Sequence, residues 1–476
     1  MRPRAVLALV FLATILLAGS MTMLSVTAPV IGGDLRASPA ATSWMVLGYL
    51  LVTATTTVAM GQLGDLWDPR RLFLLGMVLF AATSLALAVV GGAWTFVAIR
   101  TLQGLGGAVL VATAATLLAR TYPGARLAGA MGIYLGGYAA AQVAAPPLAG
   151  VVTEVVGWRW LFVGAGSLAV AGAVLGPRVL RPVPRVARTA GARFDVAGNL
   201  VLVAAVSALV LGTDAARRSG WTDPWVVACV ALAVVAVPVF VAVESRVASP
   251  VVDVGLLRER SFVLAVLAGG LVAVPRVVPT VVLAIYLQGR LGMSPTGVAG
   301  VVALLAVGVL VGSFSAGRVS MEAGVDRTCR ASVVVTVIGV VGTTAALLLT
   351  DVTAPAGRVL LLVSLALTGL AAGIYTAANG AQIMGSAPSS QSGSVNGIRT
   401  TAQSVAIAVG TAALLTSVGG GMSPQDTRAF FSGDPAGLSA AGVDQLDVNI
   451  AVTLGALLAA SVLAAVLTLL SPRRGR

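Results

Sequence analysis

Charged side chains crowd into one short stretch of this chain. The segment GQLGDLWDPRRLFLLG (residues 61–76) places Asp65, Asp68, Arg70 and Arg71 within seven positions, whereas only 10% of all residues are charged. Carboxylates and guanidinium groups at this spacing form charge-assisted hydrogen bonds and cap the ends of helices. The stretch is therefore the first candidate for a polar site.

Other kinds of chemistry leave little trace in the sequence. The chain has no histidine, and its two cysteines, Cys229 and Cys329, indicate neither a disulfide nor a metal cluster. We find no phosphate-binding loop of the G-x-x-x-x-G-K type and no G-x-S-x-G nucleophile elbow. The sequence thus predicts no catalytic residue, no metal and no cofactor, and it does not predict an enzyme.

Composition places these residues in a membrane. Hydrophobic residues make up 58% of the 476 positions and the mean hydropathy is +0.99, above the roughly 45 to 50% apolar content of soluble domains. The net charge of +13 comes from arginines dispersed between apolar runs, which favours the anionic inner leaflet of a lipid bilayer over nucleic acid as partner. The fold class is therefore all-α integral membrane protein.

Apolar runs of about 20 residues, long enough to cross a bilayer, recur along the chain. The first continues to about residue 30, so we interpret it as a membrane helix and not as a cleaved signal peptide. The expected spans are 5–30, 41–62, 71–91, 94–119, 127–153, 158–180, 195–213, 224–243, 261–287, 295–316, 331–350, 356–382, 393–418 and 448–470. Fourteen transmembrane helices place both chain ends on one side of the membrane.

The arginines indicate which side that is. With cytoplasmic termini, twenty arginines fall in inner segments and seven in outer segments, and Arg100, Arg276 and Arg399 lie within spans. Positive charge accumulates on the cytoplasmic side of membrane proteins. We therefore expect a multi-pass protein of the bacterial inner (cytoplasmic) membrane, with both termini in the cytoplasm.

The charged stretch has a weaker echo later in the chain. GRVSMEAGVDR (317–327), like residues 61–71, follows the second span of a set of six. Parallel repeats of this kind are typical of transporters whose halves rock around a central site. The expected parts are a six-helix bundle (1–180), a cytoplasmic linker (181–194), an inserted helix pair (195–243), a second cytoplasmic linker (244–260) and a second six-helix bundle (261–476).

Four motifs at matching spans together resemble one known family. GQLGDLWDPRR is similar to the loop G-x-L-a-D-r-x-G-r-r, and RTLQGLGGA (100–108) is similar to R-x-x-q-G-x-g-a. GWRWLF (157–162) and APPLAG (145–150), the latter similar to the exporter motif G-P-x-x-G-G, complete the set. The chain resembles the fourteen-helix drug:proton antiporter branch of the major facilitator superfamily, over nearly its whole length.

The resemblance assigns a gating role to the loop at 61–71. It implies that Asp65 caps and pairs across the cytoplasmic interface of the bundles, with Arg70 and Arg71 as counter-charges and Gly61 and Gly64 in the same motif. The alternative is a positive-inside turn with helix caps, as in any membrane protein. Leu66, Asp68 and Pro69 depart from the family pattern, so the charge network must differ in detail.

Two further motifs each leave two interpretations open. An arginine inside a span costs about 2.5 to 3.5 kcal/mol, and the resemblance associates Arg100, with Gln103 one turn away, with proton transfer; structural hydrogen bonding is the alternative. The exporter motif implies a bend in the fifth span that shapes the cavity. The alternative is a kink that has no bearing on the direction of transport. The residues of this motif are Ala145, Pro146, Pro147, Ala149 and Gly150.

The chain departs from the family where a proton carrier is expected. Ser20 occupies the place of an aspartate that related exporters carry in their first helix, and every acidic residue falls at a helix end or in a loop. Arginine does not deprotonate in proteins. The candidates for proton coupling are therefore Asp34 and Asp65, and loss of coupling is the alternative.

The polar residues within spans predict a substrate cavity whose charge is opposite to that expected of a cation pump. Arg276 lies between Pro275 and Pro279, which suggests a broken helix. Arginines without acidic partners in the spans favour a neutral or anionic small hydrophobic substrate; the alternative is an arginine that snorkels to the membrane surface or is bonded to carbonyls. The expected cavity residues are Ser20, Tyr49, Tyr138, Arg276, Tyr286, Asn379, Asn396 and Arg399, and the amides have helix–helix hydrogen bonding as their alternative use.

The predicted function is secondary active export. We expect a monomer that exports a small hydrophobic drug, antibiotic or natural product by alternating access, driven by protons. A lipid or metabolite exporter of the same fold, or a membrane sensor that transports nothing, is the alternative.

Overall fold

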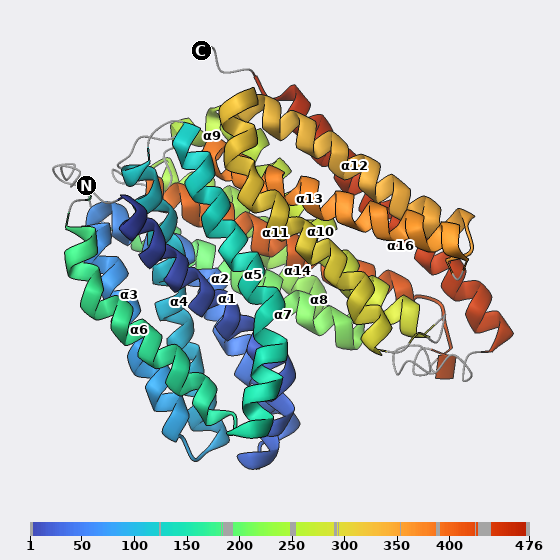
Figure 1. Ribbon diagram of the computed structural model, residues 1–476, viewed down its shortest axis with the longest axis horizontal. Coiled ribbons are helices and arrows are strands. Elements are labelled where there is room, and N and C mark those ends of the chain that lie inside the picture. The colour runs from blue at the N-terminus through green and yellow to red at the C-terminus, as the bar shows by residue number, and fades with distance from the viewer. Residues whose placement is uncertain are drawn as a thin grey trace. The chain divides into compact units, whose positions relative to one another are not determined.

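The computed structural model describes residues 3–122, 125–181, 183, 194–247, 254–289, 293, 295–352, 354–386, 391–423, 425–426 and 439–472. Residues 184–193 of the expected linker, 248–253 of the second linker, 427–438 of the expected last outer loop and the last four residues lie outside this set. Within it the regular structure is entirely helical (Figure 1). This confirms the predicted fold class.

Fourteen of the fifteen described helices have 21 residues or more, and each matches one expected span. They are α1 (Pro3–Asp34), α2 (Pro39–Leu66), α3 (Pro69–Val89), α4 (Ala93–Thr121), α5 (Ala125–Val155), α6 (Arg159–Leu180), α7 (Val196–Ser219), α8 (Pro224–Glu244), α10 (Arg260–Gly289), α11 (Pro295–Ala323), α12 (Val325–Leu349), α13 (Pro355–Met384), α14 (Ser392–Gly419) and α16 (Ala440–Leu470). The short α9 (Val254–Arg258) lies in the expected second linker.

Thirteen of the described helices are long and apolar enough to cross a membrane. The one long helix outside this group is α14, which carries Asn396, Arg399 and Gln403 among many serines and threonines. Its lower hydropathy is expected of a helix that faces other helices and not lipid. The expected span 393–418 is therefore a helix, but it does not carry an apolar segment like those of the other thirteen.

Three local expectations differ from the structure. Helix α10 runs unbroken through Pro275 and Pro279, so the expected break is absent from it. Helix α11 continues to Ala323 and takes up most of the expected turn at 317–327. Helix α16 begins at Ala440, because the Ser439 side chain accepts a hydrogen bond from the Gly442 amide and caps it. Hydropathy marks the apolar part of a helix and misses polar turns beyond it.

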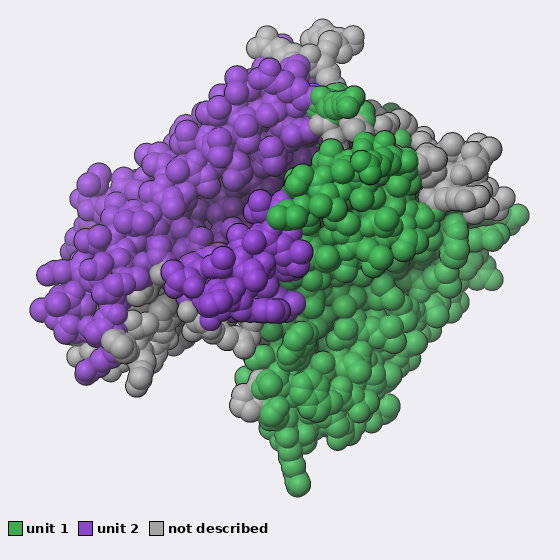
Figure 2. Space-filling view, turned by 180° about the vertical axis from the view of Figure 1, so that it is seen from behind, with its two compact units in different colours: residues 1–207, 235–259, 380–401 green, residues 208–234, 260–379, 402–476 purple. Residues whose placement is uncertain are grey.

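The described chain forms two compact units, shown in green and purple in Figure 2. The first comprises residues 1–207, 235–259 and 380–401, and the second comprises 208–234, 260–379 and 402–476. These units cut across the expected bundles, since residues 380–401 of the later part of the chain pack within the first unit. The boundaries of the six-helix bundles themselves stay a prediction.

Packing inside the units follows the repeat. In the first unit α2 lies along α4, α1 along α5, and α3 along both α4 and α6 (Figure 1). In the second unit α12 lies along α16, as α3 does along α6, and α11 approaches α13 through Gly312 and Gly369. Glycines allow such close approach because they have no side chain.

Candidate functional site

The charged stretch forms the tight turn between α2 and α3. Asp68 caps α3, because its Oδ1 accepts a hydrogen bond from the Arg70 amide at 3.1 Å, and Pro69 occupies the first helical position. The same carboxylate forms an ion pair with the Arg70 guanidinium, whose Nε lies 2.8 Å from Oδ1. Arg70 is thus bound to Asp68 and not to Asp65.

The guanidinium of Arg70 also reaches the end of α6. It donates hydrogen bonds to the carbonyl of Arg181 at 3.4 Å and to that of Val183 at 3.2 Å. A cation at the carboxyl end of a helix is favourable because the helix dipole is negative there. The neighbouring Arg71 is exposed, so the two arginines that the sequence grouped together have different surroundings.

Asp65, at the last turn of α2, caps a different helix. Its Oδ1 accepts a hydrogen bond from the Gly393 amide at 2.8 Å, and its Oδ2 accepts from the Ser394 amide at 2.8 Å and from the Ser394 hydroxyl at 3.0 Å. Gly393 and Ser394 form the first turn of α14, where amides lack helical partners and the dipole is positive. The carboxylate therefore ties α2 to α14.

The basic group that acts on Asp65 comes from a third helix. Arg120 lies at the end of α4, and its charge and that of Asp65 attract each other. The sequence had assigned this role to Arg70 and Arg71. Nothing in the loop motif points to Arg120, because it lies 55 positions away and becomes a neighbour only through the packing of α4 along α2.

Around Asp65 the backbones of α2 and α14 approach each other closely. A side chain at Gly393 would meet the Gly61 carbonyl, and one at Gly397 would lie 2.7 Å from the Cα of Val58. Further along, the Thr401 hydroxyl donates to the Ala54 carbonyl at 3.5 Å. We call this contact, from Gly61 with Gly393 to Ala54 with Thr401, the α2–α14 seam. Gly64 faces Leu72 and Thr113 instead.

Arg100 lies at the centre of a second polar cluster and is only 1% exposed. It donates to the Ser20 hydroxyl at 2.6 Å, to the Ser20 carbonyl and to Gln103 Oε1, and it stacks 4.2 Å from the Tyr49 ring. Gln103 in turn donates to the Ser84 hydroxyl at 2.6 Å. Among the described residues these partners are all neutral, which agrees with structural hydrogen bonding, and Arg100 brings Ser20 and Tyr49 together.

Asp34, at the end of α1, contacts the start of α6. It accepts hydrogen bonds from the Arg159 guanidinium at 2.6 Å and from Trp158 Nε1 at 3.1 Å. The hydrogen bonds from Arg159 and then Trp158 hold the pKa of Asp34 below its ordinary value. Its carboxylate therefore stays ionised at neutral pH and takes up a proton only at lower pH than a free aspartate.

The exporter motif faces α1. Helix α5 continues through Pro146 and Pro147, and Ala149 is buried in a core cluster with Leu24 and Ala28 of α1. A side chain at Gly19 of α1 would lie 3.7 Å from the Ala145 methyl group, whereas Gly150 has open space beside it. Small residues here allow α5 and α1 to pack closely.

The remaining predicted cavity residues fall into both units. In the first, Asn396 donates to the Val111 carbonyl at 2.9 Å and accepts from Arg399 at 3.1 Å, and Tyr138 contacts the Met21 sulfur. In the second, Asn379 donates to the Ala265 carbonyl at 3.0 Å. Both amides thus hold helices together.

Two cavity candidates in the second unit have different surroundings. Tyr286 packs in the core cluster, and Arg276 is half-buried on α10. A shared substrate chamber therefore stays a prediction.

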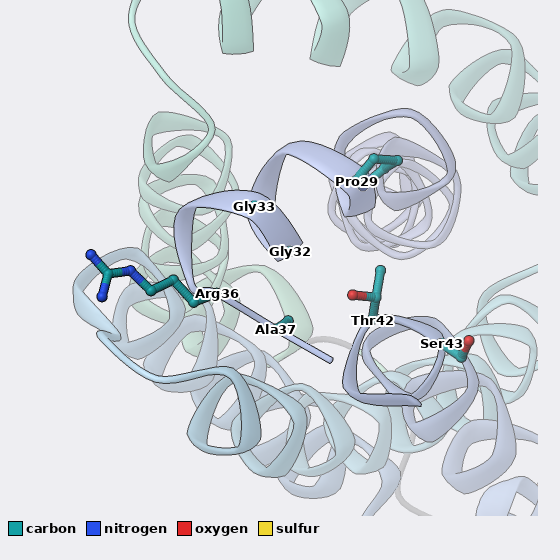
Figure 3. A pocket seen from close by; sticks show the side chains of 7 residues that line it. All are labelled: Pro29, Gly32, Gly33, Arg36, Ala37, Thr42 and Ser43. Atoms are coloured by element: carbon teal, nitrogen blue, oxygen red, sulfur yellow. The ribbon is translucent and has the colours of Figure 1, made fainter. Parts of the chain in front are cut away.

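A shallow hollow of about 550 Å³ lies where α1 ends and α2 begins. Figure 3 shows it with its lining residues, which are Pro29, Gly32, Gly33, Arg36, Ala37, Thr42 and Ser43. The guanidinium of Arg36 points away from Thr42 (Figure 3). The hollow contains none of the predicted cavity residues.

Helix composition and the capping contact together define a polytopic helical membrane protein with a polar contact at the α2–α3 turn. The comparison with known families is consistent with this class: residues 10–411 match the Major Facilitator Superfamily. The chain belongs to this superfamily.

Individual relatives support the same family. The chain is 33% identical over 294 residues, 62% of its length and 54% of the relative's, to the tetracenomycin C resistance and export protein of Streptomyces glaucescens. It is 29% identical over 431 residues, 87% of its length and 72% of the relative's, to the probable actinorhodin transporter of Streptomyces coelicolor. The chain spans about half the length of the first of these curated relatives.

Solved structures show the same fold. The crystal structure of the human organic anion transporter MFSD10 aligns with a TM-score of 0.66 at 14% identity, over 98% of this chain and 100% of the other. At this identity the likeness concerns the fold alone. It establishes the major facilitator fold for this chain.

Proposed function

We propose that this chain is an exporter of a small hydrophobic drug, antibiotic or natural product that works by alternating access in a bacterial inner membrane. The contact of Asp65 with the first turn of α14 carries the proposal. It joins a helix of the first repeat to a helix of the second through a charge and two backbone amides. Such a bond is strong enough to hold one state and weak enough to break in a cycle. The names of the two Streptomyces relatives, which describe export, support the same function.

Protons are the proposed driving force, and Asp65 is the carboxyl group to test first. Asp34 is held ionised by Arg159 and Trp158, whereas Asp65 makes contacts that protonation would weaken, because a neutral carboxyl group binds helix amides less strongly. Proton uptake at Asp65 would therefore release α14. This proposal places both termini in the cytoplasm and treats the monomer as the working unit.

We propose a neutral or anionic substrate. The observation behind this is Arg100, which is buried, and whose partners among the described residues are the neutral Ser20, Gln103 and Tyr49. An additional cation near buried guanidinium groups would be repelled, whereas an anion would be attracted. Matched cationic and anionic dyes test this point, and strong efflux of quaternary ammonium dyes would contradict it.

Efflux measured in cells with and without a protonophore tests the function as a whole. Wild type should lower dye accumulation, and the protonophore should abolish the difference. Arg100→Ala should reduce efflux about tenfold or more, because it leaves the Ser20 and Gln103 acceptors buried without their donor, while Arg71→Ala, at an exposed position, serves as the control. Equal accumulation with and without the protein would contradict the proposal.

A further inference from the structure

The inserted pair, α7 and α8, makes its polar contact with α2 one turn before Asp65. Gln62 Oε1 accepts a hydrogen bond from Asn199 Nδ2 at 2.7 Å and one from the Asp195 amide at 3.3 Å. All three residues are buried, with exposures of 4 to 5%. Gln62 and Asp65 lie three positions apart on α2, so the last turn of this helix holds α7 through one side chain and α14 through the other.

Hydrogen bonds within the first turn of α7 position the Asn199 amide. Asp195 Oδ1 accepts a hydrogen bond from the Gly198 amide at 2.9 Å and so caps the helix. Asn199 Nδ2 also donates to the Asp195 carbonyl at 2.7 Å. Because its orientation is fixed by its own helix, Asn199 loses little conformational freedom when it bonds Gln62.

Apolar contacts of the pair cover the seam itself. Val58 of α2, only 3% exposed, packs with Leu202 of α7, Phe240 of α8 and Ile398 of α14. All four residues belong to the first compact unit. Since Val58 and Ile398 come from the two helices of the seam, separation of α2 from α14 would break up this cluster as well as the bonds of Asp65.

We infer that the inserted pair is a brace for the closed seam: Gln62 and Asn199 are positioning residues that, with the cluster of Val58, Leu202, Phe240 and Ile398, hold α2 against α14. The inference rests on the proposed alternating access, in which this seam opens and closes. Helices α7 and α8 distinguish fourteen-helix chains from a plain pair of six-helix sets. The inference gives these two helices a part in setting how often the seam opens.

Labelling of a cysteine in the seam tests the brace. Thr57 is 3% exposed, and its carbonyl faces Gly397. In full-length protein with Cys229→Ala and Cys329→Ala, the Thr57→Cys side chain is treated with a membrane-impermeant maleimide in inverted vesicles. Asn199→Leu should raise the labelling rate about three- to tenfold, as expected for loss of one buried hydrogen bond. Gln62→Leu should give a similar rise, and combining the two should add little.

Two control variants separate the brace from general loosening and from failure of the seam. Asn449→Leu removes a matched buried amide that donates to the Val418 and Gly420 carbonyls in the second unit, and it should leave the labelling rate unchanged. Asp65→Ala should raise the rate. If Asp65→Ala raises it and Asn199→Leu does not, the brace is wrong and the seam stands. If neither raises it, the proposed gating fails as well.

A swap of the two amides adds a test of positioning. Gln62→Asn with Asn199→Gln keeps both functional groups and their summed length, and it should return the labelling rate towards that of wild type. A melting temperature lowered equally in Asn199→Leu and in the swapped protein, with unchanged labelling in both, would show a merely structural contact and overturn the inference.

Discussion

The two turns at equivalent places of the repeat have different surroundings. Between α2 and α3, Asp65 binds the first turn of α14, and Asp68 pairs with an Arg70 that is only 11% exposed. At the end of α11, Arg318 and Glu322 pair along the helix at 3.2 Å, with exposures of 85% and 68%. Gly324, with a φ of +84°, then joins the helices without any side-chain cap.

This difference shows that the position of a charged turn does not fix its role. An exposed pair four residues apart on a helix contributes about 0.3 to 0.5 kcal/mol. A carboxylate that accepts hydrogen bonds from amides in a partly buried site contributes about 1.5 to 3 kcal/mol per bond. The first turn therefore has the energy to favour one conformational state, and the second does not.

The largest effect is expected from Asp65→Ala. The change removes three hydrogen bonds to Gly393 and Ser394, so efflux should fall by about a hundredfold, as a loss of roughly 3 kcal/mol from the closed seam implies. Dye efflux from cells with matched protein levels measures it. If efflux by Asp65→Ala stays within twofold of wild type, the two turns do not differ in their importance for transport.

A somewhat smaller effect is expected from Gly393→Ala. The new methyl group would meet the Gly61 carbonyl, and overpacking of this kind costs about 1 to 3 kcal/mol. Efflux should fall about tenfold. Gly455→Ala on α16, where nothing lies within 4 Å of the added atom, is the matched control and should behave as wild type.

A comparison of Arg70→Ala with Arg71→Ala should show a moderate effect for the first alone. Arg70 loses its ion pair with Asp68 and its bonds to the Arg181 and Val183 carbonyls, so efflux should fall about three- to tenfold. The exposed Arg71 should change efflux by less than about twofold. Equal losses would mean that positive charge alone matters in this turn.

The smallest effect is expected in the second turn. Glu322→Gln breaks an exposed pair with Arg318 and should change efflux by less than about twofold, since such pairs contribute only about 0.3 to 0.5 kcal/mol. Glu322→Gln also serves as a control for Asp65→Ala, because each change removes one negative charge. A loss as large as that of Asp65→Ala would show that both turns gate.

Much of the fold could be predicted from the sequence. Each long apolar run is a helix, because a chain in a bilayer must satisfy its backbone groups internally. The misses lie at polar ends, as in α16, where the cap of Ser439 sets the start and hydropathy says nothing. The break expected in α10 was also wrong, because proline is tolerated within membrane helices.

The site could be predicted only in part. Asp65 was singled out by its crowded neighbourhood, but the amides that donate to its carboxylate, those of Gly393 and Ser394, lie more than 300 positions away. The signal that could have found them is the pair of small residues Gly393 and Gly397, spaced four apart, in GSVNG. Arg120 carries no such signal, because only the packing of α4 along α2 brings it near Asp65. Gln62 lies close to Asp65 in the sequence, but its partners Asp195 and Asn199 are more than 130 positions away.

A reversible cross-link between α2 and α14 tests the central claim most directly. Val58 and Ile398 pack together in the seam, so Val58→Cys with Ile398→Cys, in protein with Cys229→Ala and Cys329→Ala, can be joined by a short thiol cross-linker that a reductant cleaves. If the seam between α2 and α14 must open during transport, efflux stops when the two helices are cross-linked and returns when the cross-link is cleaved. Efflux that continues unchanged while the two helices are covalently joined would contradict the account.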